Sequence, residues 1–191
     1  MDALENIMTR RSIRNYTDQD ISDEDLTRIL KAGMSGPTCA NTRSWTFIVV
    51  RERKTLEKMA AANGRAADAL KKAKVGILVC GDMERAFKPA PDYWIIDGAI
   101  AAQNMILAAH ALGIGSIWLG TYPQMERVKG QIKLFNLPES AIPHSIIAFG
   151  YPDLQASQNL PMPPPDAPQP PPGFPREKGA FEPKRIHYEK W

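Results

Sequence analysis

The sequence predicts an α+β fold for this chain of 191 residues, and two observations support that class. Four short stretches rich in β-branched and aromatic residues are typical of buried strands. The longer segments between them carry apolar residues at helical spacing. A chain of this length can bury the core of one ordinary domain. The strands are expected at residues 45–50, 75–80, 116–119 and 144–150.

The helices have recognisable start and stop signals. Asp2 can cap a first helix in which three apolar residues (Leu4, Ile7, Met8) share a face. Ser22 with Asp25 resembles a capping box at the start of a second helix, and Gly36-Pro37 stops that helix. Further helical segments are expected over 53–73, with a break near Asn63-Gly64, over 95–112 and over 124–135, with a loop over 87–93.

One apolar stretch, residues 94–120, imitates a membrane span. It is interrupted by Asp97, Gln103 and His110, and two glycines break it before its end. A helix of this kind is typical of the buried centre of a domain in water, so we expect no membrane partner.

Composition narrows the function classes. The net charge of +3 is too small to indicate nucleic acid as the main partner. The two cysteines, Cys39 and Cys80, match no metal spacing, and no metal site is expected. Few cysteines and an acidic N-terminus without a signal-peptide pattern lead us to expect a cytoplasmic protein. No set of side chains typical of hydrolytic catalysis stands out, and His110 is expected to be a satisfied helix residue.

The segment "TRRSIRNYT" places three arginines around a serine directly after the first helix. A solvated basic turn would be the ordinary interpretation of such a cluster. Forked guanidinium donors beside a hydroxyl also suit a phosphate group. The segment alone leaves both interpretations open.

Four further segments, taken in order with that one, resemble the FMN-dependent nitroreductase family. They are "GPTCANTRSWTFIVV", "DGAIAAQNMILAAHALGIGSIWLG", "IIAFGYP" and the terminal "IHYEKW". The resemblance covers nearly the whole chain. It implies a mixed, largely antiparallel sheet flanked by helices, an intertwined homodimer, and FMN bound at the dimer interface.

The resemblance also implies a set of cofactor-binding residues. The basic turn would hold the FMN phosphate and ribityl chain, the "PTCAN" loop would touch the flavin ring from the neighbouring subunit, and "WLGTY" would pass the central ring. A C-terminal cation would reach the phosphate. The implied residues are Arg10, Arg11, Ser12, Arg14, Pro37, Thr38, Cys39, Asn41, Leu119, Gly120, Arg176 and Lys178.

Two departures from the family pattern stand out. Arg43-Ser44 replaces the Gln-Pro that the family often carries, which puts a further cation near the ring or the substrate mouth. Trp45, the next residue, is then expected in the strand core. The mid-chain Asn/Lys contact of longer relatives has no counterpart near Ala66 and Ala69.

The end of the chain differs in composition, because 11 of the 17 prolines lie from Pro152 onward. Proline lacks the amide donor of a helix or a central strand, so an extended arm is expected. We therefore divide the chain into a flavin-binding domain over 1–151 and a proline-rich arm over 152–191. The apolar residues near the end of the arm (Phe181, Ile186, Tyr188, Trp191) suggest that the arm docks on the partner subunit.

The activity that the resemblance implies is hydride transfer from NAD(P)H to an electron-poor acceptor such as a nitroaromatic or a quinone, by a ping-pong mechanism. The cofactor carries that chemistry, so no catalytic side chain is expected. Other possibilities are a flavin-binding storage or sensor protein without turnover, a flavin-fragmenting or dehalogenating branch of the family, and a proline-rich adaptor.

Overall fold

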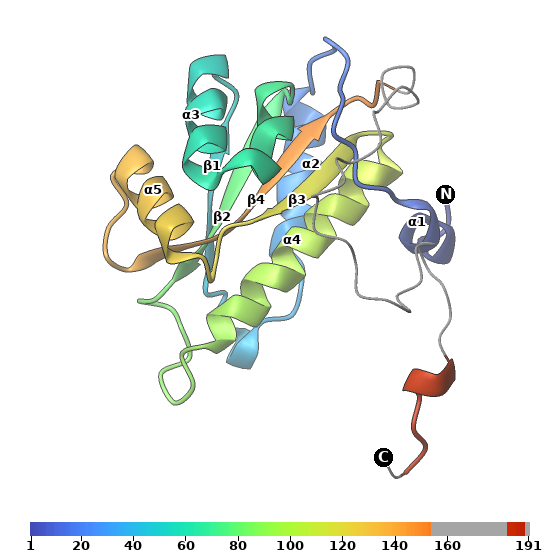
Figure 1. The fold of residues 1–191 in the computed structure, drawn as a ribbon. Helices are drawn as coiled ribbons and strands as arrows, with labels where there is room; N and C mark the ends of the chain where they lie inside the picture. The colour runs from blue at the N-terminus through green and yellow to red at the C-terminus, as the bar shows by residue number, and fades with distance from the viewer. Residues whose placement is uncertain (154–182, 190–191) are drawn as a thin grey trace.

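The computed structural model of the chain describes residues 1–153 and 183–189 (Figure 1). Its centre is a four-stranded sheet in the order β1-β2-β4-β3, and each of the three strand pairings is antiparallel. The strands are β1 (Trp45–Val50), β2 (Val75–Asp82), β3 (Gly115–Gly120) and β4 (Ala141–Gly150). The α+β class is therefore confirmed.

Helices cover both faces of the sheet (Figure 1). On one face, α2 (Asp23–Met34) and α4 (Tyr93–Ala111) pack against the side chains of Val75, Ile77 and Val79 of β2. On the other face, α3 (Arg53–Asn63) and the 3₁₀ segment Arg65–Lys71 pack against Leu78 and Cys80 of the same strand, and α5 (Met125–Phe135) lies beside α3. The central strands are apolar on both faces because both faces are covered.

The predicted helices and strands are present, with ends that differ by a few residues. The break near Asn63-Gly64 is confirmed, since α3 ends at Asn63 and Gly64 has φ of 79°. The expectation for Trp45 is only partly right. It begins β1, but β1 is an edge strand, and Trp45 is half-buried and stacked on Phe47 with ring centroids 5.2 Å apart.

The segment after α1 (Ala3–Thr9) runs along the outer edge of β3. Ser12 forms a parallel bridge with Ser116, and the Ile13 amide donates to the Ser116 carbonyl at 2.9 Å. The pairing of Ser12 with Ser116 is therefore parallel, whereas the pairings among the four strands are antiparallel. It fixes the basic turn against the sheet.

Strand β4 starts three residues earlier than the sequence predicts. Pro143 cannot donate to the ladder, which argues against a strand there. The structure accommodates it with a bulge: Val79 pairs with Ser145 and Cys80 with Pro143, so His144 is the extra residue. The His144 ring lies beside Gly98 of α4 and meets two rings edge-to-face, Trp94 of α4 and Trp118 of β3.

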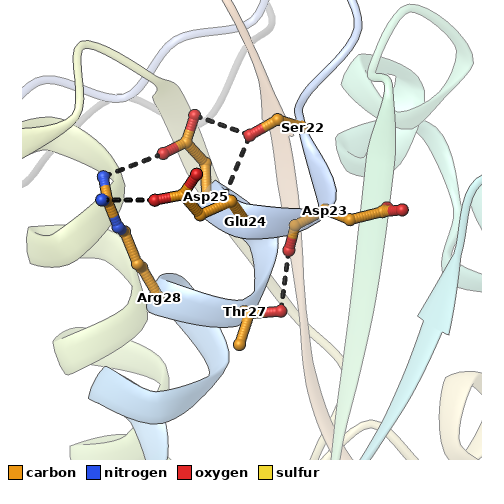
Figure 2. Close-up of polar contacts among 6 residues, drawn as sticks. All are labelled: Ser22, Asp23, Glu24, Asp25, Thr27 and Arg28. Atoms are coloured by element: carbon orange, nitrogen blue, oxygen red, sulfur yellow. Dashed lines mark hydrogen bonds and ion pairs between the residues drawn. The ribbon is translucent and has the colours of Figure 1, made fainter.

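The first turn of α2 is capped as expected, with one difference (Figure 2). The Ser22 hydroxyl accepts from the Asp25 amide at 3.0 Å, as in a capping box. The Asp25 carboxylate, however, accepts from the Ser22 hydroxyl at 3.0 Å, whereas the usual box has the longer Glu reach the backbone N–H of the cap residue. Asp is one methylene shorter, which explains the change of partner.

The first helix is an exception to the pattern of buried apolar faces. Asp2 caps α1 by accepting from the amides of Leu4 and Glu5. None of the α1 residues is buried, and Leu4 is 75% exposed. The C-terminal segment also exposes an apolar side chain. Its described part contains a 3₁₀ turn at Pro183–Arg185, and Tyr188 is 83% exposed. Across the described ranges, no helix is long and apolar enough to cross a membrane.

The Ser22 cap is expected to contribute about 1 kcal/mol to stability, as N-cap hydroxyls do. Ser22→Ala should lower the free energy of unfolding by that amount, because it leaves the Asp25 amide without its side-chain acceptor. Urea denaturation followed by circular dichroism measures the change. Ser22→Asn is the matched variant and should keep most of the stability, since Asn caps equally well. Equal losses in both variants would contradict the assignment.

Burial lowers the pKa of His144 from 6.5 to about 4. In the unfolded chain the His144 side chain therefore binds a proton near pH 6.5, whereas in the folded chain it binds one only near pH 4. Stability should therefore fall as the pH is lowered from 6.5 to 4, by a His144 contribution on the order of 3 kcal/mol. Urea midpoints across this range should fall less in His144→Gln than in the parent. Parallel pH profiles for the two proteins would rule this contribution out.

Candidate functional site

The basic turn lies at two adjoining pockets on the free edge of β3. One pocket, of about 190 Å³, is lined by Arg10, Ser12, Gln103, Ile106, Ser116, Ile117 and Trp118. The other, of about 280 Å³, shares Arg10 and Ser116 and extends toward Thr9, His110 and Gly113. The edge of the sheet, the turn and one side of α4 therefore enclose a hollow with cationic, hydroxyl and amide groups in its wall.

Three arginines in this turn have different environments. Arg10 is half-buried and lines both pockets. Arg11 also lines the larger pocket, but its guanidinium folds back on the end of α1, where Nη1 donates to the carbonyls of Met8, Thr9 and Arg10 at 3.1–3.3 Å. Arg14 is exposed beside the buried Tyr16. Among the described residues, neither Arg10 nor Arg14 forms an ion pair with a carboxylate.

Within the described part of the chain, the charges of Arg10 and Arg14 are not compensated by a carboxylate, whereas some other exposed arginines do form ion pairs. In α2, for example, Arg28 contacts the carboxylates of Glu24 and Asp25 at 2.6 and 3.4 Å (Figure 2). A cation lining a polar pocket beside a serine hydroxyl suits an anionic group such as phosphate. The Arg10 and Ser12 predictions therefore meet in one hollow, and Arg14 lies in the same turn.

The face of β3 that lines this pocket with α4 continues along the strand. Ser116, Trp118 and Gly120 lie on this face, while Ile117 and Leu119 point into the core on the other. Trp118 remains 37% exposed, and a Cβ added at Gly120 would meet nothing within 4 Å. A flat ligand could therefore approach the strand here. The carbonyl of Gly120 is turned inward, where Asn63 Nδ2 and Arg127 Nη1 donate to it at 3.1 and 2.8 Å.

The loop predicted to touch the ring lies elsewhere on the single chain. Residues 37–41 line neither of the two pockets. They follow α2, include a 3₁₀ turn at Cys39–Asn41, and rest against the start of α4. Arg176 and Lys178 lie outside the described residues. One copy of the chain therefore brings Arg10, Ser12 and the β3 edge together, and leaves the loop apart from them.

Asp97 holds this loop, and sequence reasoning did not assign it a role. It is 2% exposed, its Oδ1 accepts from the Cys39 amide at 2.9 Å, and its Oδ2 accepts from the Ser44 hydroxyl at 2.6 Å. The sequence did show a carboxylate within an apolar helix. Such a group is buried only where hydrogen-bond donors contact it, so its position indicated that donors lie nearby. Gln103, six residues further along α4, lines the pocket at Arg10, and it too was assigned no role from the sequence.

Comparison with known proteins gives a family match over most of the chain. The model of the "Nitroreductase family" matches residues 7–151. A protein from Methanothermobacter thermautotrophicus, named "Putative NADH dehydrogenase/NAD(P)H nitroreductase", is 42% identical over 191 residues, which are 100% of this chain and 88% of that protein. A protein of the same name from Archaeoglobus fulgidus is 41% identical over 190 residues, 100% of this chain and 99% of its own.

Solved structures agree with the sequence relatives. The crystal structure of an FMN-dependent nitroreductase from Clostridium difficile matches with a TM-score of 0.79 and 27% identity, over 98% of this chain and 99% of that one. A structure from Bacteroides thetaiotaomicron, with the same name as the two archaeal relatives, matches with a TM-score of 0.79 and 36% identity, over 99% and 98% of the two chains. The chain therefore belongs to the nitroreductase family.

Proposed function

We propose that this chain transfers hydride from NAD(P)H to an electron-poor acceptor, a nitroaromatic or a quinone, by a ping-pong mechanism at a site shared by two subunits. It is an NAD(P)H-dependent oxidoreductase with FMN as its cofactor, in keeping with its family and with relatives named NAD(P)H nitroreductase and FMN reductase. The acceptor, the order of the reaction and the dimer are the parts that we propose.

The observation that carries the proposal is the uncompensated Arg10 in a polar pocket beside Ser12 and Gln103. FMN ends in a phosphate, and these groups fit it: a guanidinium supplies charge and forked donors, and the hydroxyl and amide supply further hydrogen bonds. Arg14 adds a second positive charge to the same turn. The open space at Gly120 lies further along β3, on the side where the ring would extend.

When bound, FMN supplies the group that accepts a hydride and then gives it up. The chain's own residues bind, orient and shield. Arg10, Ser12 and Arg14 would hold the phosphate, and the β3 backbone at Leu119 and Gly120 would limit the ring to one exposed face. Two substrates must then use that face in turn, which is the physical reason for ping-pong order.

A second copy of the chain would complete the site. The loop at 37–41 lies away from the pockets of its own chain, and a neighbouring subunit could bring it to the ring. The single chain also leaves apolar side chains without cover: Leu4, Ile7 and Met8 on α1, and Tyr93 and Ile96 on α4. Burying such residues favours association. The arm, 152–191, is proposed to dock on the same partner.

Initial rates should give parallel double-reciprocal lines when NADH is varied at several fixed concentrations of a quinone. The reason is that the donor product must leave the shared face before the acceptor enters it. Stopped-flow absorbance should show the flavin bleached by NADH alone and recoloured by the quinone alone. Intersecting lines would mean that both substrates bind together, and bleaching without steady turnover would favour a binding protein.

Arg10→Ala should weaken FMN binding by about ten- to a hundredfold, as expected for a lost hydrogen bond between charged groups. Riboflavin, which lacks the phosphate, should lose far less affinity. Fluorescence titration of the apoprotein with each flavin measures both constants. Arg11→Ala is the matched control and should have the smaller effect, because its guanidinium is engaged by the end of α1. If Arg10→Ala loses affinity equally for FMN and for riboflavin, the role of Arg10 is structural.

A further inference from the structure

The loop between α2 and β1 adopts a backbone that its residues disfavour. Ala40, Asn41 and Arg43 have φ values of 47°, 55° and 52°, in the left-handed region that non-glycine residues rarely occupy. Asn tolerates this region better than Ala or Arg do. Three such residues within four positions persist only where the surroundings hold them, and backbone strain of this kind clusters at functional sites.

Buried and backbone hydrogen bonds hold the loop at both ends. Asp97 accepts from the Cys39 amide and from the Ser44 hydroxyl, so one carboxylate joins the two ends. The Ser44 carbonyl accepts from the Asp82 amide of β2 at 3.0 Å. The Arg43 amide is also engaged, because it donates to Thr38 Oγ1 at 3.0 Å. The backbone of Arg43 is therefore fixed even though its side chain is exposed.

The fixed backbone presents the Arg43 guanidinium to solvent. Its Nε donates to Asn41 Oδ1 at 3.4 Å, and within residues 1–153 and 183–189 it has no carboxylate partner. Arg85 places a second guanidinium at the same loop, with its Nε donating to the Thr42 carbonyl at 3.3 Å. Arg43 thus resembles Arg10 and Arg14 in having no carboxylate partner among the described residues, and its backbone is held by hydrogen bonds.

We propose that Arg43 is a specificity-determining residue that binds an oxyanion on one of the two substrates. The inference rests on the proposed function, in which this loop lies at the flavin of the neighbouring subunit. The oxyanion belongs either to the acceptor, as an aromatic carboxylate, or to the donor, as the 2′-phosphate that distinguishes NADPH from NADH. Arg is suited to both, because its planar fork matches carboxylate and phosphate oxygens.

The test compares substrates that differ only in this charge. The acceptors are 4-nitrobenzoate and its neutral counterpart 4-nitrobenzamide, and the donors are NADPH and NADH. In Arg43→Gln, the ratio of kcat/KM values within one of these pairs should fall about tenfold, while the neutral member changes little. A fall in the acceptor ratio identifies the carboxylate, and a fall in the donor ratio identifies the 2′-phosphate. If both ratios stay at their parent values, Arg43 does not select substrates and the proposal is wrong.

Arg28→Gln is the matched control, since it removes an exposed arginine whose charge is already met by Glu24 and Asp25 (Figure 2). Both kcat/KM ratios should be unchanged in Arg28→Gln. If a ratio falls as much as it does in Arg43→Gln, the effect is due to the net charge of the protein and the proposal is wrong. Binding of benzoate, benzamide, NADP⁺ and NAD⁺ to the FMN-loaded protein, measured by calorimetry, gives a readout that needs no turnover. A parent protein without oxidoreductase activity would refute the proposed function, while loss of anion preference in Arg43→Gln would still support Arg43.

Discussion

The buried carboxylate of Asp97 is the interaction on which the geometry of the loop between α2 and β1 depends. Burying such a group is costly unless strong donors meet it, and here the Cys39 amide and the Ser44 hydroxyl meet its two oxygens. Those donors stand at the two ends of a loop that contains three left-handed residues. The donors that satisfy the buried carboxylate therefore also hold the two ends of the loop. The Arg43 amide, which donates to Thr38 Oγ1, and the Asp82 amide, which donates to the Ser44 carbonyl, hold it further.

Helix α4 carries this constraint to the rest of the site. Asp97 and Gln103 are six residues apart, which corresponds to roughly 9 Å along the axis of a helix. The first residue fixes the loop and the second lines the pocket at Arg10 and Ser12. The helix is in turn buried against β2 and β4, so its position is set by the core.

The sequence predicts the elements of this fold well, because their signals are local. The Ser22 cap and the apolar strands depend on residues that lie close together in the chain. The start of β4 could not be predicted, since Pro143 argues against a strand and only pairing with β2 reveals the bulge at His144. The role of Asp97 was equally inaccessible, because its partners stand 58 and 53 positions away. The arginine cluster of the basic turn was visible in the sequence. The presence of Gln103 and Trp118 in the same pocket was not, because the turn reaches them through the parallel bridge at Ser12, a contact between distant residues.

The unpaired cations of the proposed phosphate site would link cofactor binding to stability. Arg10 and Arg14 stand in one short turn without acidic partners among the described residues, and nearby charges of like sign repel each other. A phosphate bound at this turn would offset that repulsion. It would favour the folded state, in which the bridge between Ser12 and Ser116 holds the turn against the sheet. A ligand that binds only the folded state stabilises it by an amount that grows with the logarithm of its concentration relative to its dissociation constant. In the proposed site, the Ser12–Ser116 bridge is therefore the contact through which cofactor binding would stabilise the sheet.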